Sequence, residues 1–318
     1  MMPRTSPPYI DPGLDVIVRF HDAARIYELD RAIFSLLGQR YRPIRILLVL
    51  QRFSAEQSAA VVAALGPLLS LTEGVELVLP EFQATSAPDA RAELLNAGLA
   101  AALGRYLAIL DYDDVILPQA YDRLIERLTI GGAAIAFGCT PVVTSEMHEG
   151  FLRAMEIGQP FEGEGLGDLF AANFCPIHSY MMDRERIPPG LLRFEAALTI
   201  EEDYEFLLRL CSEVRSDFTL LDVPVGLYFQ KDDNSNTFAE ATLARPEAVQ
   251  RMAIAREFVA LRRRLCVLSR QVQAELGVDP HRAGMTVQDW LDQRASDLRA
   301  AAASLEGDGA VCNDSQPG

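Results

Sequence analysis

The stretch Leu107-Ala-Ile-Leu-Asp-Tyr-Asp-Asp114 joins a short apolar run to three carboxylates within four positions. Four apolar residues are too few for a helix, so Leu107 to Leu110 predict a buried strand. Side chains two positions apart in an extended chain point to the same side, which directs Asp111 and Asp113 toward one place. This pattern predicts a cation site at the end of a strand.

A divalent metal is the cation that these residue types favour. No Lys or Arg lies between Arg105 and Arg123 to neutralise the charges, and carboxylates this close raise one another's pKa unless a cation is present. Oxygen ligands suit Mg or Mn, with phosphate oxygens completing the coordination shell. The alternative is that Asp113 and Asp114 only shape the turn before a helix beginning at Pro118. That alternative explains one aspartate better than three.

The composition limits the kind of protein. The chain has 318 residues, 49% of them hydrophobic, which is enough for one large core or two smaller ones. Its formal net charge of -16 repels polyanions, so nucleic acid is not an expected partner. The five cysteines are scattered and form no Cys-x-x-Cys pair, which fits a reducing cytoplasm better than a disulfide framework. We identify no signal-peptide or membrane-spanning apolar run.

Strand and helix patterns alternate along the first two thirds of the chain. Strands are predicted at 15–20, 44–50, 75–79, 107–110, 133–137, 180–182 and 219–223, and helices at 29–37, 55–65 and 90–103. The alternation predicts an α/β fold with a Rossmann-like, doubly wound and mostly parallel sheet, whose ligands lie beyond the carboxyl ends of the strands. Asp111 lies at such an end.

The remaining segments suggest how the chain is divided. We expect a flexible lead at 1–14, a main domain at 15–240, a C-terminal helical extension at 241–306 and a disordered tail at 307–318. A Gly- and Glu-rich stretch, 158–167, is a candidate mobile loop. The extension carries Arg262-Arg263-Arg264, for which three interpretations stay open: a solvated helix face, an oligomer contact, and contact with an anionic membrane surface.

A second acidic group opens the helix predicted at Ile200 to Leu210. Carboxylates at a helix N-terminus are stabilised by the helix dipole whether or not they take part in chemistry. Helical spacing places Asp203 with Phe206 on the apolar stripe, and Glu202 with Glu205 on the polar one. A carboxylate on the inward face opens into the cleft of the sheet, partly desolvated, as a general base near neutral pH requires.

Two further segments contain polar groups that could reach the same cleft. Cys175-Pro-Ile-His-Ser-Tyr180 precedes a predicted strand, and a histidine such as His178 is more often structural than catalytic. Lys231-Asp-Asp-Asn-Ser-Asn-Thr237 is a polar loop that could cover a phosphate, although solvated loops of this composition are common.

From about Asp15 to Thr237, the order and spacing of these segments resemble the family 2 glycosyltransferases, which are inverting enzymes with the GT-A fold. The densest match consists of Arg91-Ala-Glu-Leu-Leu-Asn-Ala-Gly98, Gly104-Arg-Tyr106 and Leu110-Asp-Tyr-Asp-Asp114. These look like the family's Asn-x-Gly helix followed by its Asp-x-Asp strand end. The strand ending at Phe20 resembles the family's opening unit, and Glu202-Asp203 falls where its Glu-Asp base motif is expected.

The resemblance implies roles for individual residues. Asp111 and Asp113 would serve the donor's ribose and a divalent metal, Mg or Mn, that bridges its diphosphate, with Asp113 the principal metal ligand. Asp203 would deprotonate the acceptor hydroxyl as general base. Further donor contacts are implied at Phe20, Asp22, Gln51 and Arg91. Secondary or acceptor-side contacts are implied at Glu202, His178 and Lys231.

The sequence departs from the family pattern in three places. Where the family usually has an acidic pair after its second strand, one of which reads the nucleobase, this chain has Gln51-Arg52. Where the family often has a histidine near the end of the domain, this chain has Lys231, which could replace metal charge in part. Leu95 stands where an arginine is common, and Arg91, one turn back, is a substitute.

The resemblance implies sugar transfer from a nucleotide-sugar donor, most simply a UDP-sugar, to a glycan, glycolipid or protein acceptor in surface polysaccharide synthesis. The expected location is the cytoplasm or the inner membrane face, with a homo-oligomer through the C-terminal helices as a further expectation. A catalytically inactive scaffold stays open as an alternative, because Gln51-Arg52 departs from the donor motif. A haloacid-dehalogenase-type phosphatase also uses Asp-x-Asp, but its downstream lysine and separate acidic pair have no match, since the sole lysine, Lys231, abuts Asp232-Asp233.

Overall fold

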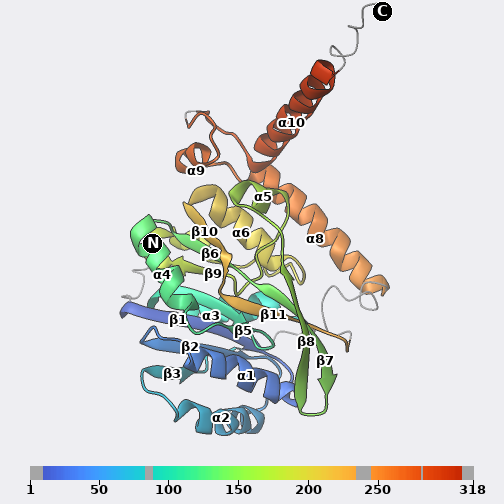
Figure 1. The fold of residues 1–318 in the computed structure, drawn as a ribbon. Helices are drawn as coiled ribbons and strands as arrows, with labels where there is room; N and C mark the ends of the chain where they lie inside the picture. Colours follow the sequence, from blue (N-terminus) through green and yellow to red (C-terminus); the bar gives the residue numbers. More distant parts are fainter. Residues whose placement is uncertain (1–9, 83–88, 234–244, 281, 310–318) are drawn as a thin grey trace, which may run out of the picture.

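The computed structural model describes residues 10–82, 89–233, 245–280 and 282–309. They form a central seven-stranded sheet in the order β10-β6-β9-β4-β1-β2-β3 and a four-stranded sheet in the order β5-β11-β7-β8. Helices cover the central sheet, and three further helices follow at the C-terminal side (Figure 1). The predicted α/β class is confirmed.

The central sheet is parallel except at one strand. It consists of β1 (Ile10–Phe20), β2 (Ile44–Leu50), β3 (Val75–Val78), β4 (Gly104–Asp111), β6 (Ile135–Cys139), β9 (Tyr180–Asp183) and β10 (Ser216–Pro224). Only β9 is antiparallel to its neighbours, β4 and β6, among these described strands. Strands β1 and β4 pair in a register that sets Arg19 beside Asp111. Their carboxyl ends therefore bring two charged side chains to the same edge.

Alternate side chains of the central strands enter two cores on opposite faces of the sheet. In β1, Ile17 packs into one core, whereas Val16 and Val18 pack into the other. The first core includes α3 (Arg91–Ala101) and α6 (Glu202–Glu213), and the second includes α1 (Ile26–Leu37), α2 (Ala55–Leu69) and α4 (Ala120–Gly131). Each fully buried aliphatic side chain contributes about 1.5–3 kcal/mol. This two-sided burial fixes the strand ends that carry the acidic groups.

The second sheet was not predicted from the sequence. It consists of β5 (Val115–Ile116), β7 (Pro141–His148), β8 (Phe151–Pro160) and β11 (Gly226–Lys231). The expected mobile loop at 158–167 is wrong at both ends, because β8 pairs with β7 as far as Pro160 and α5 (Leu166–Ala171) begins before the stretch ends. Lys231 is the last residue of β11 and not part of a loop; residues 234–237 of the predicted polar loop lie outside the described residues.

The C-terminal extension consists of α8 (Pro246–Leu265), α9 (Arg270–Glu275) and α10 (Val287–Gly309), of which α10 points away from the body (Figure 1). Helix α8 packs against α6. Arg262 lies 2.6 Å from Glu205, and Arg263 donates hydrogen bonds to Ala171 O at 2.6 Å and Tyr204 Oη at 2.8 Å. These two arginines therefore bind groups of the protein itself. Within the described ranges, no helix combines the length and apolar content needed to cross a membrane.

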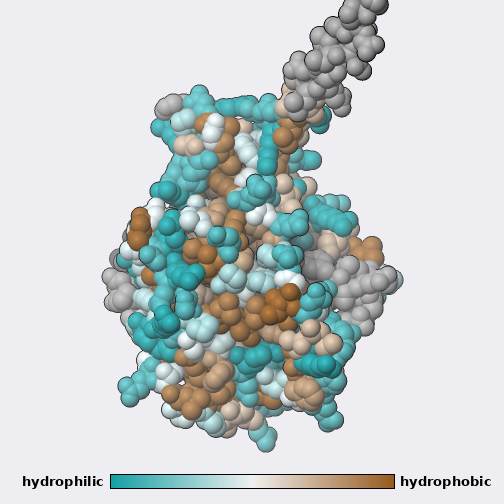
Figure 2. Space-filling model, viewed as in Figure 1, coloured by the Kyte–Doolittle hydropathy of each residue, from teal (hydrophilic) through white to brown (hydrophobic). Residues whose placement is uncertain are grey.

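Two described elements extend into the expected end segments, whose remaining residues lie outside the described ranges. Strand β1 begins at Ile10, because that residue already pairs with Gly104 of β4. Helix α10 continues to Gly309, past the expected start of the tail. Three short 3-10 helices complete the described elements: η1 (Ala23–Arg25), η2 (Arg184–Arg186) and η3 (Pro189–Leu191). The space-filling view shows a mixed surface with apolar patches between hydrophilic residues (Figure 2), and exposed apolar side chains include Phe151 and Ile157 of β8.

Candidate active site

A cavity of about 330 Å³ lies where β1 and β4 end. Arg19 and Asp111 reach it from these strands, Glu202 and Asp203 from the start of α6, and Tyr228 from β11. The segment from Asn173 to His178 forms another wall. This is the position at which parallel α/β sheets bind ligands, because the strand ends and the following loops leave a crevice there.

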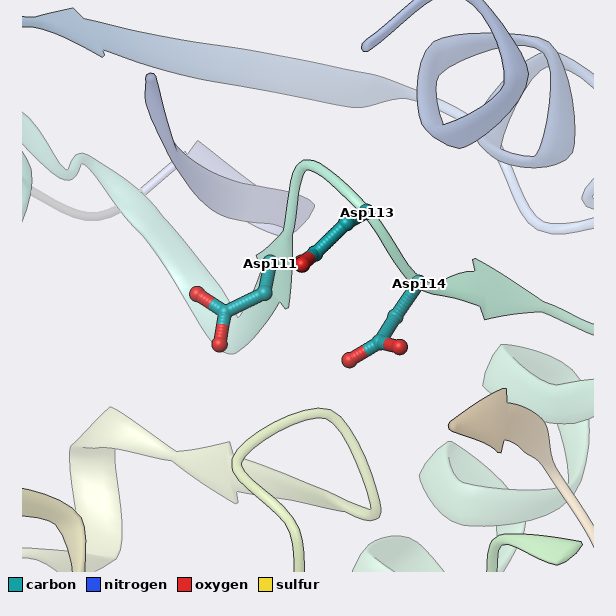
Figure 3. Close-up of side chains that lie close together, drawn as sticks. All are labelled: Asp111, Asp113 and Asp114. Atoms are coloured by element: carbon teal, nitrogen blue, oxygen red, sulfur yellow. The ribbon is translucent and has the colours of Figure 1, made fainter. Parts of the chain in front are cut away.

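Three aspartates lie together at the end of β4. Asp111 ends the strand, and Asp113 and Asp114 lie on the turn into β5 (Figure 3). Each offers a carboxylate oxygen, and these oxygens lie within 4.8 Å of one another. The side chain of Asp113 points toward Asp111 in the close-up. The sequence pattern therefore corresponds to a real cluster of oxygen donors.

Arg19 binds the first of these aspartates. Its Nε lies 2.7 Å from Asp111 Oδ1 and its Nη2 lies 3.1 Å from Asp111 Oδ2, while Nη1 donates to Glu202 Oε1 at 2.9 Å. Burial alone would raise the pKa of Asp111, but the charge and hydrogen bonds of Arg19 hold it below its usual value. Asp111 is therefore an ionised carboxylate with its countercharge already present.

Lys231 binds the second aspartate. Its Nζ lies 2.7 Å from Asp113 Oδ2 and 2.9 Å from Glu28 Oε2, and its side chain is only 2% exposed. Asp114 is held differently: its Oδ1 accepts a hydrogen bond from the Phe229 backbone N–H at 2.9 Å. Burial, with the charges of its neighbours, raises the pKa of Asp114 well above its usual range. The three carboxylates thus differ in their partners.

His178 lies beside Asp114 and is buried. Its Nδ1 is 3.2 Å from Asp114 Oδ2, without the alignment of a hydrogen bond. Burial lowers the pKa of His178 to about 4, so the imidazole is neutral at neutral pH. Its ring lies parallel to that of Tyr228, with centroids 6.5 Å apart. His178 lines the cavity as an uncharged wall, and its proposed acceptor-side role stays a prediction.

Asp203 is the cavity carboxylate whose pKa lies near neutral pH. Burial, together with the charges of Glu202 and Glu201, raises its pKa to about 7. Its Oδ1 accepts a hydrogen bond from Tyr204 N at 2.8 Å, and Asn173 Nδ2 lies 3.4 Å from Oδ2. A carboxylate that titrates near neutral pH can accept a proton during a reaction. The sequence prediction that this side chain faces the cleft agrees with the structure.

Glu202 does not follow the sequence prediction. Helical spacing placed it with Glu205 on the polar side of α6, but both side chains are buried. Arginines supplied by other elements explain the difference: Arg19 binds Glu202, and Arg262 approaches Glu205. The preceding residue, Glu201, has a left-handed φ of 62° at the helix N-cap, a strained conformation often found at functional sites.

Of three other residues predicted to contact the donor, only Arg91 lines the cavity. Arg91 lines the cavity and binds Asp89, with Nε 3.1 Å from Oδ1. Gln51 is buried at the end of β2 and does not line the cavity. Asp22 accepts a hydrogen bond from Ala24 N and caps η1.

The structure corrects the prediction that the Phe20 side chain contacts the donor. Its side chain is wholly buried and packs on Phe53 and Tyr112, with ring centroids 5.4 and 5.2 Å away. Because neighbours on a strand face opposite ways, Arg19 reaches the cavity and Phe20 enters the core. The side chain of Phe20 is therefore not available to a donor.

Sequence reasoning missed several polar residues of the site, among them Arg19, Glu28, Asn173 and Tyr228. A signal existed for Arg19, because this charged residue follows the apolar run Val16-Ile-Val18 near the end of a predicted strand. Glu28 could not be found in this way, because its partner Lys231 is 203 positions away in the sequence.

Two curated proteins are similar to this chain in sequence. ExoO, the succinoglycan biosynthesis protein of Rhizobium meliloti, is 28% identical over 228 residues, which cover 64% of this chain and 57% of ExoO. An uncharacterised glycosyltransferase of Nostoc sp., alr2836, is 34% identical over 113 residues, covering 36% of this chain and 32% of the relative. The matches thus span between about a third and just over half of the length of these relatives.

Solved structures support the fold. Residues 1–349 of S. aureus TarS, crystallised with UDP, superpose with a TM-score of 0.54 at 14% identity, covering 83% of this chain and 70% of that one. The same TarS fragment in complex with UDP-GlcNAc gives a TM-score of 0.54 at 13% identity. The central sheet is therefore that of the GT-A glycosyltransferases. The profile described as glycosyl transferase family 2 matches residues 15–185, more than half of the chain, and the chain belongs to that family.

Proposed function

We propose that the chain is an inverting glycosyltransferase that moves a sugar from a nucleotide-sugar donor to an acceptor hydroxyl. The observation that carries this proposal is the presence in one cavity of Asp111, at the end of β4, and Asp203, whose pKa is raised to about 7. An ionised carboxylate and a carboxylate poised near neutral pH can divide the work of donor binding and proton transfer.

The reaction would be a single displacement. The Asp203 carboxylate takes the proton of the acceptor hydroxyl while that oxygen forms a bond to the anomeric carbon of the donor. The bond from this carbon to the diphosphate oxygen breaks on the opposite face, and the nucleoside diphosphate leaves with the electron pair. Attack opposite the leaving group inverts the configuration. Arg19 fixes Glu202 and thereby the first turn of α6, which carries Asp203.

Mg or Mn fits the donor types at this site, because Asp111, Asp113 and Asp114 provide only oxygen. Bound there, the ion would supply positive charge to the leaving diphosphate. We propose Asp113 as the principal ligand. Both oxygens of Asp111 are engaged by Arg19, and Asp114 is turned toward the Phe229 backbone.

We propose a UDP-sugar as donor and a glycan, glycolipid or protein as acceptor, in surface polysaccharide synthesis in the cytoplasm. Support for the pathway comes from the name of ExoO, a succinoglycan biosynthesis protein. Support for the donor comes from the TarS structures, whose ligands are UDP and UDP-GlcNAc. The phosphatase alternative is abandoned, because the chain belongs to a glycosyltransferase family and both oxygens of its candidate nucleophile, Asp111, are held by Arg19.

Thermal stabilisation by nucleotides tests the donor site. A ligand of the native state raises the melting temperature with occupancy, so UDP, GDP, TDP and CMP should be compared with and without Mn. We expect a shift with one of them, UDP first. Asp203→Asn should keep this shift but lose sugar transfer, whereas Asp113→Asn should lose the part of the shift that Mn adds. If no nucleotide and no donor sugar shifts the melting temperature, the scaffold alternative is favoured.

A further inference from the structure

We propose that Lys231 acts as a built-in countercharge of the donor site, so that diphosphate binding depends only partly on a divalent metal. The inference rests on the proposed function, since it assumes that a nucleoside diphosphate enters the cavity. Lys231 is a positioning residue in this proposal: it acts on the donor through Asp113.

The first support is the burial of the ammonium group. Lys231 is the only lysine of the chain, and its side chain is 2% exposed. The ammonium lies between Asp113 and Glu28, and the Glu28 side chain is 0% exposed. A buried ammonium without carboxylate partners would be strongly destabilising, so this arrangement requires both acidic groups. Two carboxylates surround one ammonium group, and Arg25 provides a second positive charge. Its Nη1 donates a hydrogen bond to Glu28 Oε1, the oxygen that Lys231 does not bind, at 2.9 Å.

The second support is the direction from which Lys231 reaches the site. On β11, Tyr228 and Gln230 line the cavity. Lys231 is one position away from Gln230 and is turned to the other face of the strand, toward the core. It therefore binds Asp113 from the side of the core. A second contact, from Arg31 Nη2 to the backbone O of Asp113 at 2.5 Å, adds positive charge to the same turn.

The third support is the state of the other two aspartates. Arg19 occupies both oxygens of Asp111, and the Phe229 N–H and His178 flank Asp114. Most oxygens of the cluster are therefore already close to a protein nitrogen. A divalent ion would have to share Asp113 with an ammonium group 2.7 Å from its Oδ2, and two cations on one carboxylate repel each other.

These contacts change what a metal has to do. In a cluster of unpaired carboxylates, an ion must first cancel the negative charge that would repel a diphosphate. Here Arg19 and Lys231 already provide that cancellation at Asp111 and Asp113. A metal would then strengthen donor binding without being required for it. A histidine, which the family often has at the place of Lys231, can ligate a metal as a neutral imidazole and would then leave the charge of Asp113 to the metal.

Titration calorimetry of the wild-type protein tests whether nucleotide binding depends only partly on a metal. UDP is titrated once in EDTA and once in saturating Mg or Mn. The other nucleotides of the panel replace UDP if it does not bind. We expect binding in EDTA, weaker than with metal by no more than about tenfold. Binding that occurs with metal and vanishes in EDTA would overturn the role of Lys231 and leave the proposed function standing. Absence of binding under both conditions, for every nucleotide, would overturn both.

Lys231→Met and Lys231→His test which residue sets the metal requirement. Without the ammonium, the uncancelled charge of Asp113 repels the diphosphate, so nucleotide affinity in EDTA should fall by about tenfold or more in both variants. Metal should recover most of this loss in Lys231→His. An equal loss with and without metal would indicate a merely structural lysine and overturn the proposal.

The matched control is Arg127→Gln, which removes an ion pair of similar length, 2.7 Å, to Asp217, a residue of β10 that does not line the cavity. It should leave the ratio of the affinities with and without metal unchanged. A change of this ratio as large as that of the Lys231 variants would contradict a specific role for Lys231. Melting curves of all three variants identify any that fail to fold.

The single lysine also allows a direct observation. In protein labelled with ¹⁵N-lysine, one side-chain Nζ signal reports on this group alone. We expect a slowly exchanging signal, because the ammonium is buried, and a change of its shift on adding UDP in EDTA. The proposal would be overturned if the signal exchanges as rapidly as that of a solvated lysine. It would also be overturned if the chemical shift of the signal does not change when a nucleotide is bound.

Discussion

Arg19 binds Asp111 through two parallel hydrogen bonds, from Nε to Oδ1 at 2.7 Å and from Nη2 to Oδ2 at 3.1 Å. The third nitrogen of the same guanidinium, Nη1, donates to Glu202 at 2.9 Å. One side chain thus joins β1, the end of β4 and the first turn of α6. Such paired hydrogen bonds fix both distance and orientation, which a lysine could not do.

Arg19→Gln should destabilise the fold. The substitution leaves Asp111 and the buried Glu202 without their cation, and breaking a buried pair costs on the order of 3 kcal/mol. The free energy of unfolding, measured by urea denaturation, should fall by about that amount. The pKa of Asp111 should rise as well, because Arg19 is what lowers it.

The ion pair of Arg127 and Asp217, which lies outside the site, provides a comparison for the loss of stability in Arg19→Gln. Arg127→Gln removes the contact with Asp217, in which the arginine is 29% exposed, and should cost no more than about 1 kcal/mol because solvent screens the charge. Equal losses in the two variants would mean that the Arg19 network contributes nothing beyond an ordinary surface ion pair.

The strands of the central sheet could be predicted because their apolar runs are bounded clearly. Strand β2 matches its predicted range of 44–50, and β4 extends the predicted run by three residues before it and one after it. Parallel pairing then follows from the alternation with helices, and it places Asp111 at an edge where ligands bind. The base candidate Asp203 was found because helical spacing separates it from its acidic neighbours.

The second sheet and the ion pairs could not be predicted, because they depend on contacts distant in sequence. Nearly every side chain of β8 is at least partly exposed, so the strand has no apolar face that a pattern could reveal. The partners of Lys231 lie in α1 and after β4, more than 100 positions away. Burial of Glu202 likewise depends on an arginine from β1. Local spacing contains no information on such partners.

The rate of sugar transfer should rise with pH through about 7. Burial and the charges of Glu202 and Glu201 raise the pKa of Asp203 to that value, and a general base works only when deprotonated. Below the pKa, kcat/KM should therefore fall about tenfold per pH unit. A profile of kcat/KM from pH 5 to 9 at constant ionic strength measures this. A flat profile across that range would exclude Asp203 as the base.

Asp203→Asn should stabilise the protein at alkaline pH while it abolishes transfer. The folded-state pKa, about 7, lies above the unfolded value, about 3.9. The contribution of Asp203 to stability is thus fully present below pH 4 and is lost as pH rises through 7, where the buried carboxylate must ionise. The variant avoids this loss, so it should be more stable than wild type at pH 8, by at least about 1 kcal/mol, and no more stable at pH 4. Urea denaturation at both pH values tests the sign.

Glu205 connects the C-terminal extension to the helix that carries the base. Its side chain is fully buried, with Arg209 Nε 2.8 Å away on the same helix and Arg262 Nε 2.6 Å away on α8. Either arginine alone still neutralises the carboxylate. Loss of both would leave a buried, unpaired charge, which is far more costly than a weakened pair.

Arg209→Gln and Arg262→Gln should therefore be non-additive. Each single variant should lower the free energy of unfolding by about 1 kcal/mol, whereas the double variant should lose about 3–5 kcal/mol, because only then is Glu205 unpaired. Adding Glu205→Gln to the double variant removes the unpaired charge and should recover part of the loss. Losses that merely add would mean that the two arginines do not share Glu205.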